Sequence, residues 1–116
     1  MAATFNLTGV RRGNSFERLF RFKDGGGQAV DLTGSEIIFV AETATSTIRK
    51  STVDGTLLMA LPASGEIMLK LTPAETRLFA VGRLKSRYEI ERRIGGTEET
   101  LVRGCLVVEE GLNDDA

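Results

Sequence analysis

The chain contains 116 residues, of which 41% are hydrophobic and 27% charged, and its formal net charge is -1. This length suits one domain with a single core, and the balanced charge excludes a strong electrostatic attraction to nucleic acid or to an anionic membrane. The chain has no histidine and one cysteine, which excludes Ser-His-Asp and Cys-His catalysis, most zinc sites and an internal disulfide.

No segment of the sequence directs the chain to a membrane. Residues 1–13 lack the charged start, apolar centre and small-residue cleavage site of a signal peptide. The longest apolar runs, such as residues 56–61, are much shorter than the ~20 residues needed to cross a bilayer. We therefore expect the protein to be made and to fold in the cytoplasm.

The amino-terminal part predicts two strands. Residues 4–7 predict a short strand and residues 11–14 a polar turn. Residues 15–23 predict a second strand, in which Arg18 interrupts the apolar face. This interruption favours a strand near a sheet edge or one with a bulge. Three aromatic side chains share the apolar face: Phe16, Phe20 and Phe22.

A glycine-rich turn and a buried strand follow. Residues 24–27, Asp-Gly-Gly-Gly, favour a hairpin connection because glycine tolerates positive φ. A phosphate-binding loop would instead lead into a helix, whereas residues 29–32 look extended. Residues 36–42 carry apolar side chains on both faces, which is typical of a central strand or of one covered by a neighbouring subunit.

The middle of the chain has weaker patterns. Residues 43–47 predict a polar loop, and residues 48–54 allow a short, charged strand. Residues 56–61 are apolar at consecutive positions and show no strand alternation. Residues 66–71 alternate regularly and predict a strand. Its inward side chains are Ile67, Leu69 and Leu71.

A single helical turn is predicted near residues 73–79. Thr72 suits the N-cap, a proline follows it, and Glu75 three residues later completes a capping box. We expect Leu78 and Phe79 to pack this turn against the strands.

The carboxy-terminal part predicts two strands joined by a turn. Residues 84–92 form the first strand, residues 95–97 the turn and residues 100–109 the second strand. Gly104 interrupts the second strand and marks a bulge or a close approach of two backbone segments. The inward side chains of the strand at residues 84–92 are Leu84, Ser86, Tyr88 and Ile90. Residues 110–116 form a polar tail.

These elements predict an all-β fold. Six to eight short strands with regularly spaced turns are typical of an antiparallel β-sandwich. Because no linker or internal repeat divides the sequence, we expect one domain that spans residues 1–116.

The sequence predicts no catalytic, cofactor or metal site. Cys105 has apolar neighbours, typical of a structural cysteine, although Arg103 on the same face leaves a reactive thiol as the alternative. Glu89 and Glu91 share a strand face ~7 Å apart, a separation that glycosidases use. Nearby basic residues favour two ionised carboxylates, so a solvated row of charges is the preferred interpretation.

Two basic doublets are candidate interface residues: Arg11 and Arg12, and Arg92 and Arg93. A nucleic-acid patch is disfavoured because aromatic side chains for base stacking are few and acidic neighbours cancel the field. Charged contacts with another protein are the preferred interpretation, since arginine is enriched at interfaces.

Leu57, Leu58 and Met59 form the third candidate interface segment. Three consecutive apolar residues cannot all point inward from a strand. The segment is either an irregular crossover buried beneath its own loop or an exposed apolar patch covered by an oligomeric partner.

Six phrases follow one another along the chain: Gly-Asn-Ser-Phe, Asp-Gly, Val-Asp-Leu-Thr-Gly, Leu-Thr-Pro-x-x-Thr, Tyr-Glu and Arg-Gly-x-Leu-x-Val. They are residues 13–16, 24–25, 30–34, 71–76, 88–89 and 103–108. This order resembles the immunoglobulin-like domain at the start of phage baseplate upper proteins and in small phage tail proteins. The resemblance covers nearly the whole chain, although the third glycine of the turn and residues 43–60 depart from it.

The resemblance implies an immunoglobulin-like sandwich that serves as a virion structural protein, a small adaptor or docking component of a tail or baseplate. It implies a location in the virion, other virion proteins as partners in a symmetric assembly, and a homo-oligomer as a further option. It implies no enzyme and no cofactor, while the balanced charge and the short apolar runs predict no contact with nucleic acid or membrane. The alternatives are a module that binds the host surface or decorates the capsid, and a small enzyme that works without histidine. Exposed edges and residues 1–7 and 111–116 are expected to dock by strand addition.

Overall fold

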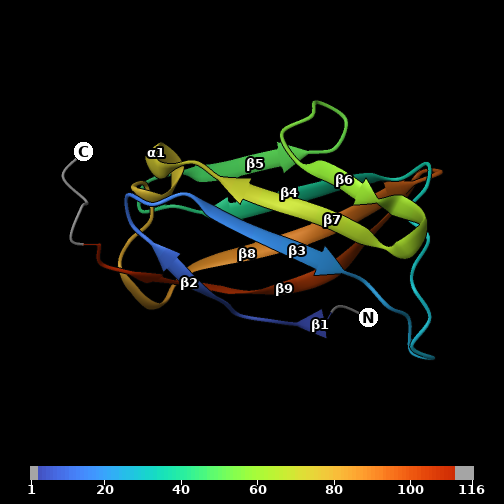
Figure 1. The fold of residues 1–116 in the computed structure, drawn as a ribbon, viewed down its shortest axis with the longest axis horizontal. Coiled ribbons are helices and arrows are strands. Elements are labelled where there is room, and N and C mark those ends of the chain that lie inside the picture. Colours follow the sequence, from blue (N-terminus) through green and yellow to red (C-terminus); the bar gives the residue numbers. More distant parts are fainter. Residues whose placement is uncertain (1–2, 112–116) are drawn as a thin grey trace.

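Two β-sheets packed face to face make up the fold (Figure 1). The structure is a computed structural model and describes residues 3–111, apart from the side chains of residues 83–85. The larger sheet has the strand order β1-β9-β8-β4-β5, with β2 also paired to β9, and the smaller sheet has the order β3-β7-β6. In Figure 1 the smaller sheet lies in front of the larger one.

The strands have the following bounds. The larger sheet contains β1 (Ala3–Thr4), β2 (Leu7–Arg11), β4 (Glu36–Glu42), β5 (Thr47–Ser51), β8 (Gly82–Ile94) and β9 (Thr97–Glu109). The smaller sheet contains β3 (Phe16–Arg21), β6 (Leu58–Leu61) and β7 (Glu66–Leu71). Two short helical segments flank β7, a 3-10 helix (Pro62–Ser64) and α1 (Pro73–Thr76).

The strand order is that of an immunoglobulin-like sandwich, which confirms the predicted fold class. In such a domain strands B, E and D share one sheet and strands G, F, C and C′ share the other. β3, β7 and β6 form the first of these sheets, and β9, β8, β4 and β5 form the second, all with antiparallel neighbours. β1 and β2 pair in parallel with β9 at one edge of the larger sheet.

The core lies between the two sheets and has aromatic rings at its centre. Phe39 on β4 and Tyr88 on β8 are buried, with ring centroids 5.9 Å apart. Phe20 on β3 reaches the Tyr88 ring from the opposite sheet, with a centroid separation of 6.4 Å. Burial of large apolar side chains stabilises the fold by about 1.5–3 kcal/mol each. The alternating residues therefore determine which face of each strand turns inward.

Several predicted strands are confirmed. β4 and β7 have the bounds that the alternation predicted, and β4 lies centrally between β5 and β8. β3 lies at the edge of the smaller sheet and pairs with β7 in an unbroken register, so an edge position and not a bulge explains the pattern at Arg18. The guanidinium of Arg18 lies over the ring of Phe5, 5.0 Å from its centroid.

The Asp24 carboxylate accepts hydrogen bonds from the backbone of Gly26 and Gln28 and closes the predicted turn.

The amino-terminal strand lies elsewhere than predicted. Residues 4–7 do not form one strand, because β1 and β2 are separated by Phe5 and Asn6, which pass over Gly104 on β9. The backbone N–H of Phe5 donates to the carbonyl of Arg103 at 2.9 Å. A Cβ at position 104 would overlap the carbonyl oxygen of Phe5. Gly104 therefore permits a close backbone approach, one of the two roles predicted for it.

The helical turn after β7 has the predicted capping box. Thr72 Oγ1 accepts a hydrogen bond from the Glu75 backbone at 3.1 Å, and Glu75 Oε1 accepts one from the Thr72 backbone at 2.9 Å. α1 is shorter than residues 73–79, since the chain leaves the helix after its first turn. Phe79 is buried as expected, whereas Leu78 is 51% exposed. The expectation that both pack inward is therefore corrected for Leu78.

Residues 1–2 and 112–116 lie outside the described residues, so most of the predicted tail (residues 110–116) is not placed. Gly111 lies so close to the end of β2 that a Cβ there would overlap the carbonyl oxygen of Arg12. Among the described residues, no helix has the length and apolar character that a membrane crossing requires.

Candidate functional site

The outward side of the smaller sheet carries apolar side chains across its three strands. Leu19 on β3 lies opposite Met68 on β7, and Leu58 on β6 lies opposite Met68 from the other side. Leu19 is 39% exposed and Leu58 44%, with Met68 half-buried between them. These three residues form the apolar row. Leu61, at the end of β6, is also exposed and lies opposite Glu66.

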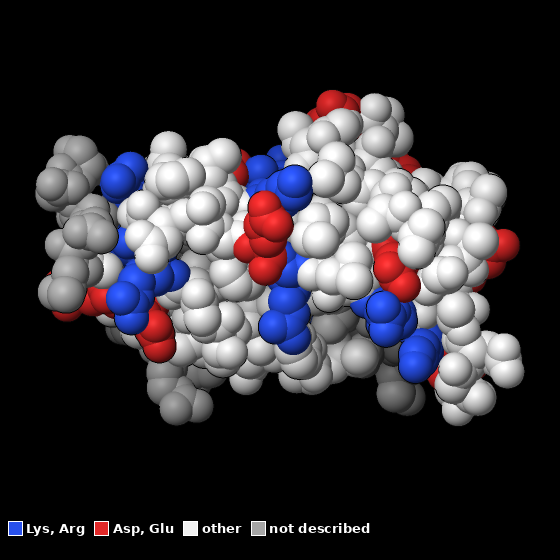
Figure 2. Space-filling model, in the orientation of Figure 1, with Lys and Arg blue, Asp and Glu red and all other residues white. Residues whose placement is uncertain are grey.

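Two ion pairs flank the apolar row, one on each side along the strands. Glu17 and Lys70 lie opposite each other, with 3.9 Å between Oε2 and Nζ. On the other side, Arg21 Nε donates to Glu66 Oε2 at 3.0 Å. Figure 2 shows this face, where charged side chains gather in groups with uncharged surface between them. The face therefore has an apolar centre and a charged rim.

The alternation of β7 produces this arrangement. Its inward side chains fill the core and force Glu66, Met68 and Lys70 outward. An exposed apolar centre with a polar rim is the anatomy of a protein–protein contact. The rim charges Glu17 and Lys70 are more than half exposed, so their ion pair adds little to stability and can exchange partners when a second protein binds.

The structure separates the three predicted interface residues Leu57, Leu58 and Met59. Leu57 is buried in the core, and Met59 is partly buried against it. Leu58 points to the outward side and joins the apolar row. Leu58 and Met59 belong to the regular strand β6 and so are not part of an irregular crossover, and of these three side chains Leu58 is the exposed one. A partner that covers it stays a prediction.

The two basic doublets lie at opposite ends of β9. Arg11 pairs with Glu109, with 3.9 Å between charged atoms, and Arg92 pairs with Glu99 at 3.7 Å. Those glutamates are ten residues apart on β9 (109 minus 99), which corresponds to about 33 Å along a strand. The structure therefore does not bring Arg11 and Arg12 together with Arg92 and Arg93.

Arg12 and Arg92 each hold parts of the fold together. Arg12 Nη2 donates to the carbonyl of Arg77 at 2.9 Å, which links the end of β2 to the segment after α1. Arg92 Nε donates to Ser35 Oγ at 2.9 Å and Nη2 to the carbonyl of Asp31 at 3.0 Å. An interface role for these arginines stays a prediction.

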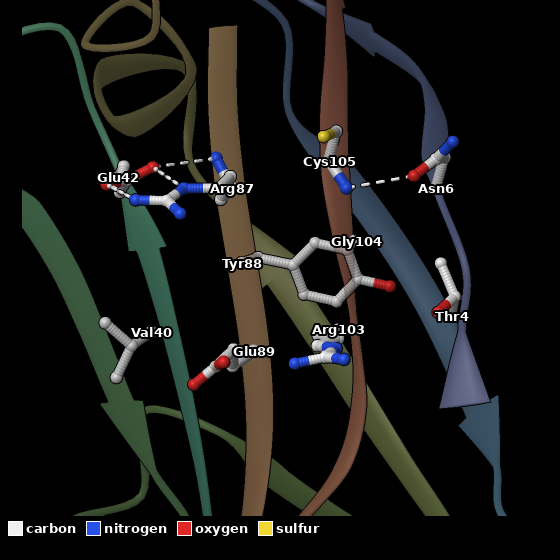
Figure 3. A pocket seen from close by; sticks show the side chains of 10 residues that line it. All are labelled: Thr4, Asn6, Val40, Glu42, Arg87, Tyr88, Glu89, Arg103, Gly104 and Cys105. Carbon is white, nitrogen blue, oxygen red and sulfur yellow. Dashed lines mark hydrogen bonds and ion pairs between the residues drawn. The ribbon is translucent and has the colours of Figure 1, made fainter. Parts of the chain in front are cut away.

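The outward side of the larger sheet carries a ladder of charges around a shallow hollow of about 510 Å³ (Figure 3). Arg87 donates to both carboxylate oxygens of Glu42, at 2.9 and 3.0 Å, and these hydrogen bonds lower the pKa of Glu42. Arg93 similarly donates to Glu91 at 2.6 Å. Glu42 and Glu91 are thus each paired with an arginine on this face. A solvated row of charges at Glu89 and Glu91 stays the preferred interpretation.

Cys105 lines the same hollow and is partly exposed. Its backbone N–H donates to Asn6 Oδ1 at 3.0 Å, which ties β9 to the amino-terminal segment (Figure 3). Within the part of the chain that the structure describes, no three histidine, cysteine or acidic residues come together as metal ligands.

Sequence reasoning missed Leu19 and Met68 as members of a candidate site. Each occurs singly as an outward apolar residue, and neither stands out in its own strand. Only the register of β3 with β7 and of β7 with β6 brings them beside Leu58. The outward position of Met68 in the alternation of residues 66–71 was the available signal.

Comparison with known proteins does not assign the chain to a family. No protein-family model matches the sequence, and no curated protein matches it. Function has to be inferred from the fold, from the sequence phrases and from the apolar row with its charged rim.

Proposed function

We propose that the protein is a non-catalytic structural component of a virion, a small docking module of a phage tail or baseplate that acts through contacts with other virion proteins. The phage assignment is supported by the six sequence phrases, whose order resembles the immunoglobulin-like domains of baseplate and tail proteins. The docking role is supported by the apolar row of Leu19, Met68 and Leu58 and its two flanking ion pairs. This surface is the observation that carries the proposal.

The fold suits a mechanical role. β3 and β7 anchor the docking face, because their inward side chains, such as Phe20 and Leu69, are buried in the shared core. A face held in this way binds without the entropic cost of ordering a flexible loop. In a symmetric assembly with many copies, individually weak contacts then add up to firm attachment.

Mass spectrometry of purified virions tests the proposal. Particles produced by the phage or prophage that carries the gene should contain the protein in a constant ratio to the other tail proteins. Its absence from intact particles would refute the virion role. A cell-binding assay with the isolated protein separates docking from host recognition, since a docking module should show no affinity for host cells.

A pair of variants tests the docking face itself. Leu19→Asp introduces a charge into the apolar row and should reduce incorporation into particles, because burying an unpaired charge is costly. Val53→Asp is the matched control, since Val53 is 75% exposed and lies in the turn between β5 and β6, outside the apolar row. Equal incorporation of both variants would show that another surface makes the contact.

A further inference from the structure

We propose that the outward face of the β3-β7-β6 sheet pairs with the same face of a second copy of this chain. The two copies are related by a twofold axis that lies in the plane between the two faces. It runs along the apolar row, perpendicular to the strands. This inference rests on the proposed docking role and names one partner for it, a second copy.

The charges of this face reverse sign across the apolar row. On β3 the outward residues on either side of Leu19 are Glu17 and Arg21. On β7 those on either side of Met68 are Lys70 and Glu66. Each strand thus has a negative charge on one side of the row and a positive charge on the other, and the two strands have opposite order.

A twofold rotation perpendicular to the strands makes this pattern complementary to itself. The rotation places the apolar row on the apolar row of the second copy and exchanges the two charged ends. Glu17 then faces Arg21 of the second copy, and Lys70 faces Glu66 of the second copy. Each contact occurs twice because the interface is isologous. The pairing therefore forms four attractive contacts around an apolar centre that includes all three strands.

The geometry of sheet packing is compatible with this axis. The rotation sets β3 of one copy antiparallel to β3 of the other, and aligned sheets pack with strand directions within about 30° of each other. An axis along the strands, midway between β3 and β7, would also oppose unlike charges, with Glu17 over Lys70 of the second copy. That arrangement leaves Leu58 and the rest of β6 without a counterpart, so the perpendicular axis buries more of the exposed apolar surface.

The interface is small. Three strands ~4.8 Å apart cover much less than the ~800 Å² per partner of a standard stable complex. We therefore expect pairing of the isolated protein at micromolar or weaker affinity. In an assembly that holds copies near one another, a high effective concentration would make such a contact sufficient.

Sedimentation equilibrium of single and mixed variants tests the pairing and its axis. The wild-type protein should show a rising mean mass with concentration, up to that of a dimer. Glu17→Lys alone sets the introduced lysine against Arg21 at two symmetric contacts, and Arg21→Glu alone sets the introduced glutamate against Glu17. Each variant alone should raise the dissociation constant roughly tenfold. A mixture of the two should restore wild-type affinity, because both cross-copy contacts between positions 17 and 21 become attractive.

A second mixture serves as the matched control. Glu17→Lys mixed with Lys70→Glu should not recover affinity under the perpendicular axis, because the introduced lysine still faces Arg21 and the introduced glutamate faces Glu66. Recovery in this mixture instead would establish the axis along the strands and overturn the one proposed. Within each chain the disturbed ion pairs are the same alone and in mixture, so changes in folding cancel from the comparison. Circular dichroism of each variant checks that it folds.

The outcome also separates this inference from the proposed function. A wild-type protein that remains monomeric at millimolar concentration, or a first mixture that pairs no better than its components, would overturn the pairing. Detection of the protein in virions would stand in either case and would assign the face to a different virion protein. Absence from virions together with a wild-type dimer would leave the pairing and remove the phage role.

Discussion

The hydroxyl of Tyr88 on β8 donates a hydrogen bond of 2.5 Å to the backbone carbonyl of Phe5, 83 residues earlier in the chain. The two groups meet across Gly104, which lies directly opposite Tyr88 in the pairing of β8 with β9. Since glycine has no side chain, the amino-terminal segment can pass over β9 at this point. The missing side chain at Gly104 therefore leaves room for the hydrogen bond by which Tyr88 ties the amino-terminal segment to the core.

Gly104→Ala should disrupt this junction. The added methyl group would overlap the backbone carbonyl group of Phe5. Neither group can rotate away, because the methyl carbon and the carbonyl are both attached directly to the backbone. We expect destabilisation by about 1–3 kcal/mol and faster hydrogen exchange of the Phe5 amide, which bonds to Arg103. Gly25→Ala is the control, because a Cβ at Gly25 meets open space. Equal unfolding free energies for both variants would contradict the close approach.

The alkaline titration of Tyr88 should report its burial. Desolvation raises the pKa of Tyr88 from 10.0 to about 12. Because the chain contains one tyrosine, phenolate absorbance follows this group alone. The stability that the protonated hydroxyl contributes is complete below pH 10. It is lost as pH rises from 10 to 12, because the unfolded state ionises first.

Tyr88→Phe separates the contribution of the Tyr88 hydroxyl to stability from that of other groups that titrate at alkaline pH. The variant loses the hydrogen bond to Phe5 and should be less stable by about 1–2 kcal/mol near neutral pH. The difference from the wild type should shrink between pH 10 and 12. A wild-type phenolate that titrates near 10 in the folded protein would mean that the hydroxyl is accessible to water.

Glu75 joins the capping box of α1 to the larger sheet. Its carboxylate accepts two hydrogen bonds from Lys50 Nζ, at 3.0 and 2.8 Å, and the Lys50 side chain is 9% exposed. Burial alone would raise the pKa of Glu75, but the hydrogen bonds from Lys50 and Thr72 outweigh it, so the pKa is lowered. The stabilisation is therefore complete above pH 4.5 and is lost as pH falls through the lowered pKa.

Glu75→Gln keeps a side chain that can complete the capping box and removes the charge that Lys50 faces. We expect a loss of about 2 kcal/mol at neutral pH, because the ammonium group of Lys50 stays largely buried without its counter-charge. Chemical denaturation across the acid range should show the two proteins converging as pH falls. Glu17→Gln, at an exposed ion pair, should change stability by less than about 1 kcal/mol.

The sequence predicted the strands and the helical turn whose patterns lie within a few consecutive residues. The alternation of residues 36–42 and 66–71 and the capping box at Thr72 are contained within a few residues, and the structure confirms them. The path of residues 3–11 depends on Gly104, about a hundred residues away, and no pattern within the segment announces a parallel pairing with β9.

The candidate surface illustrates the same distinction. Leu58 was predicted as an interface residue because three consecutive apolar residues cannot all face inward, a constraint visible in one segment. Leu19 and Met68 could not be added, since their position beside Leu58 depends on the registers of two strand pairs. The predicted basic doublets have strong local sequence signals, yet β9 holds them at opposite ends.

Phe39→Ala tests the position of the core. Phe39 is fully buried, and its ring packs against Tyr88 with a centroid separation of 5.9 Å. Truncation removes the buried ring and leaves a cavity, so we expect destabilisation by about 3–5 kcal/mol, measured by chemical denaturation. Val40→Ala on the same strand is the control, because Val40 is 36% exposed and faces the opposite side. A larger effect at Val40 than at Phe39 would mean that β4 turns its other face to the core, and every inward assignment on β5 and β8 would reverse with it.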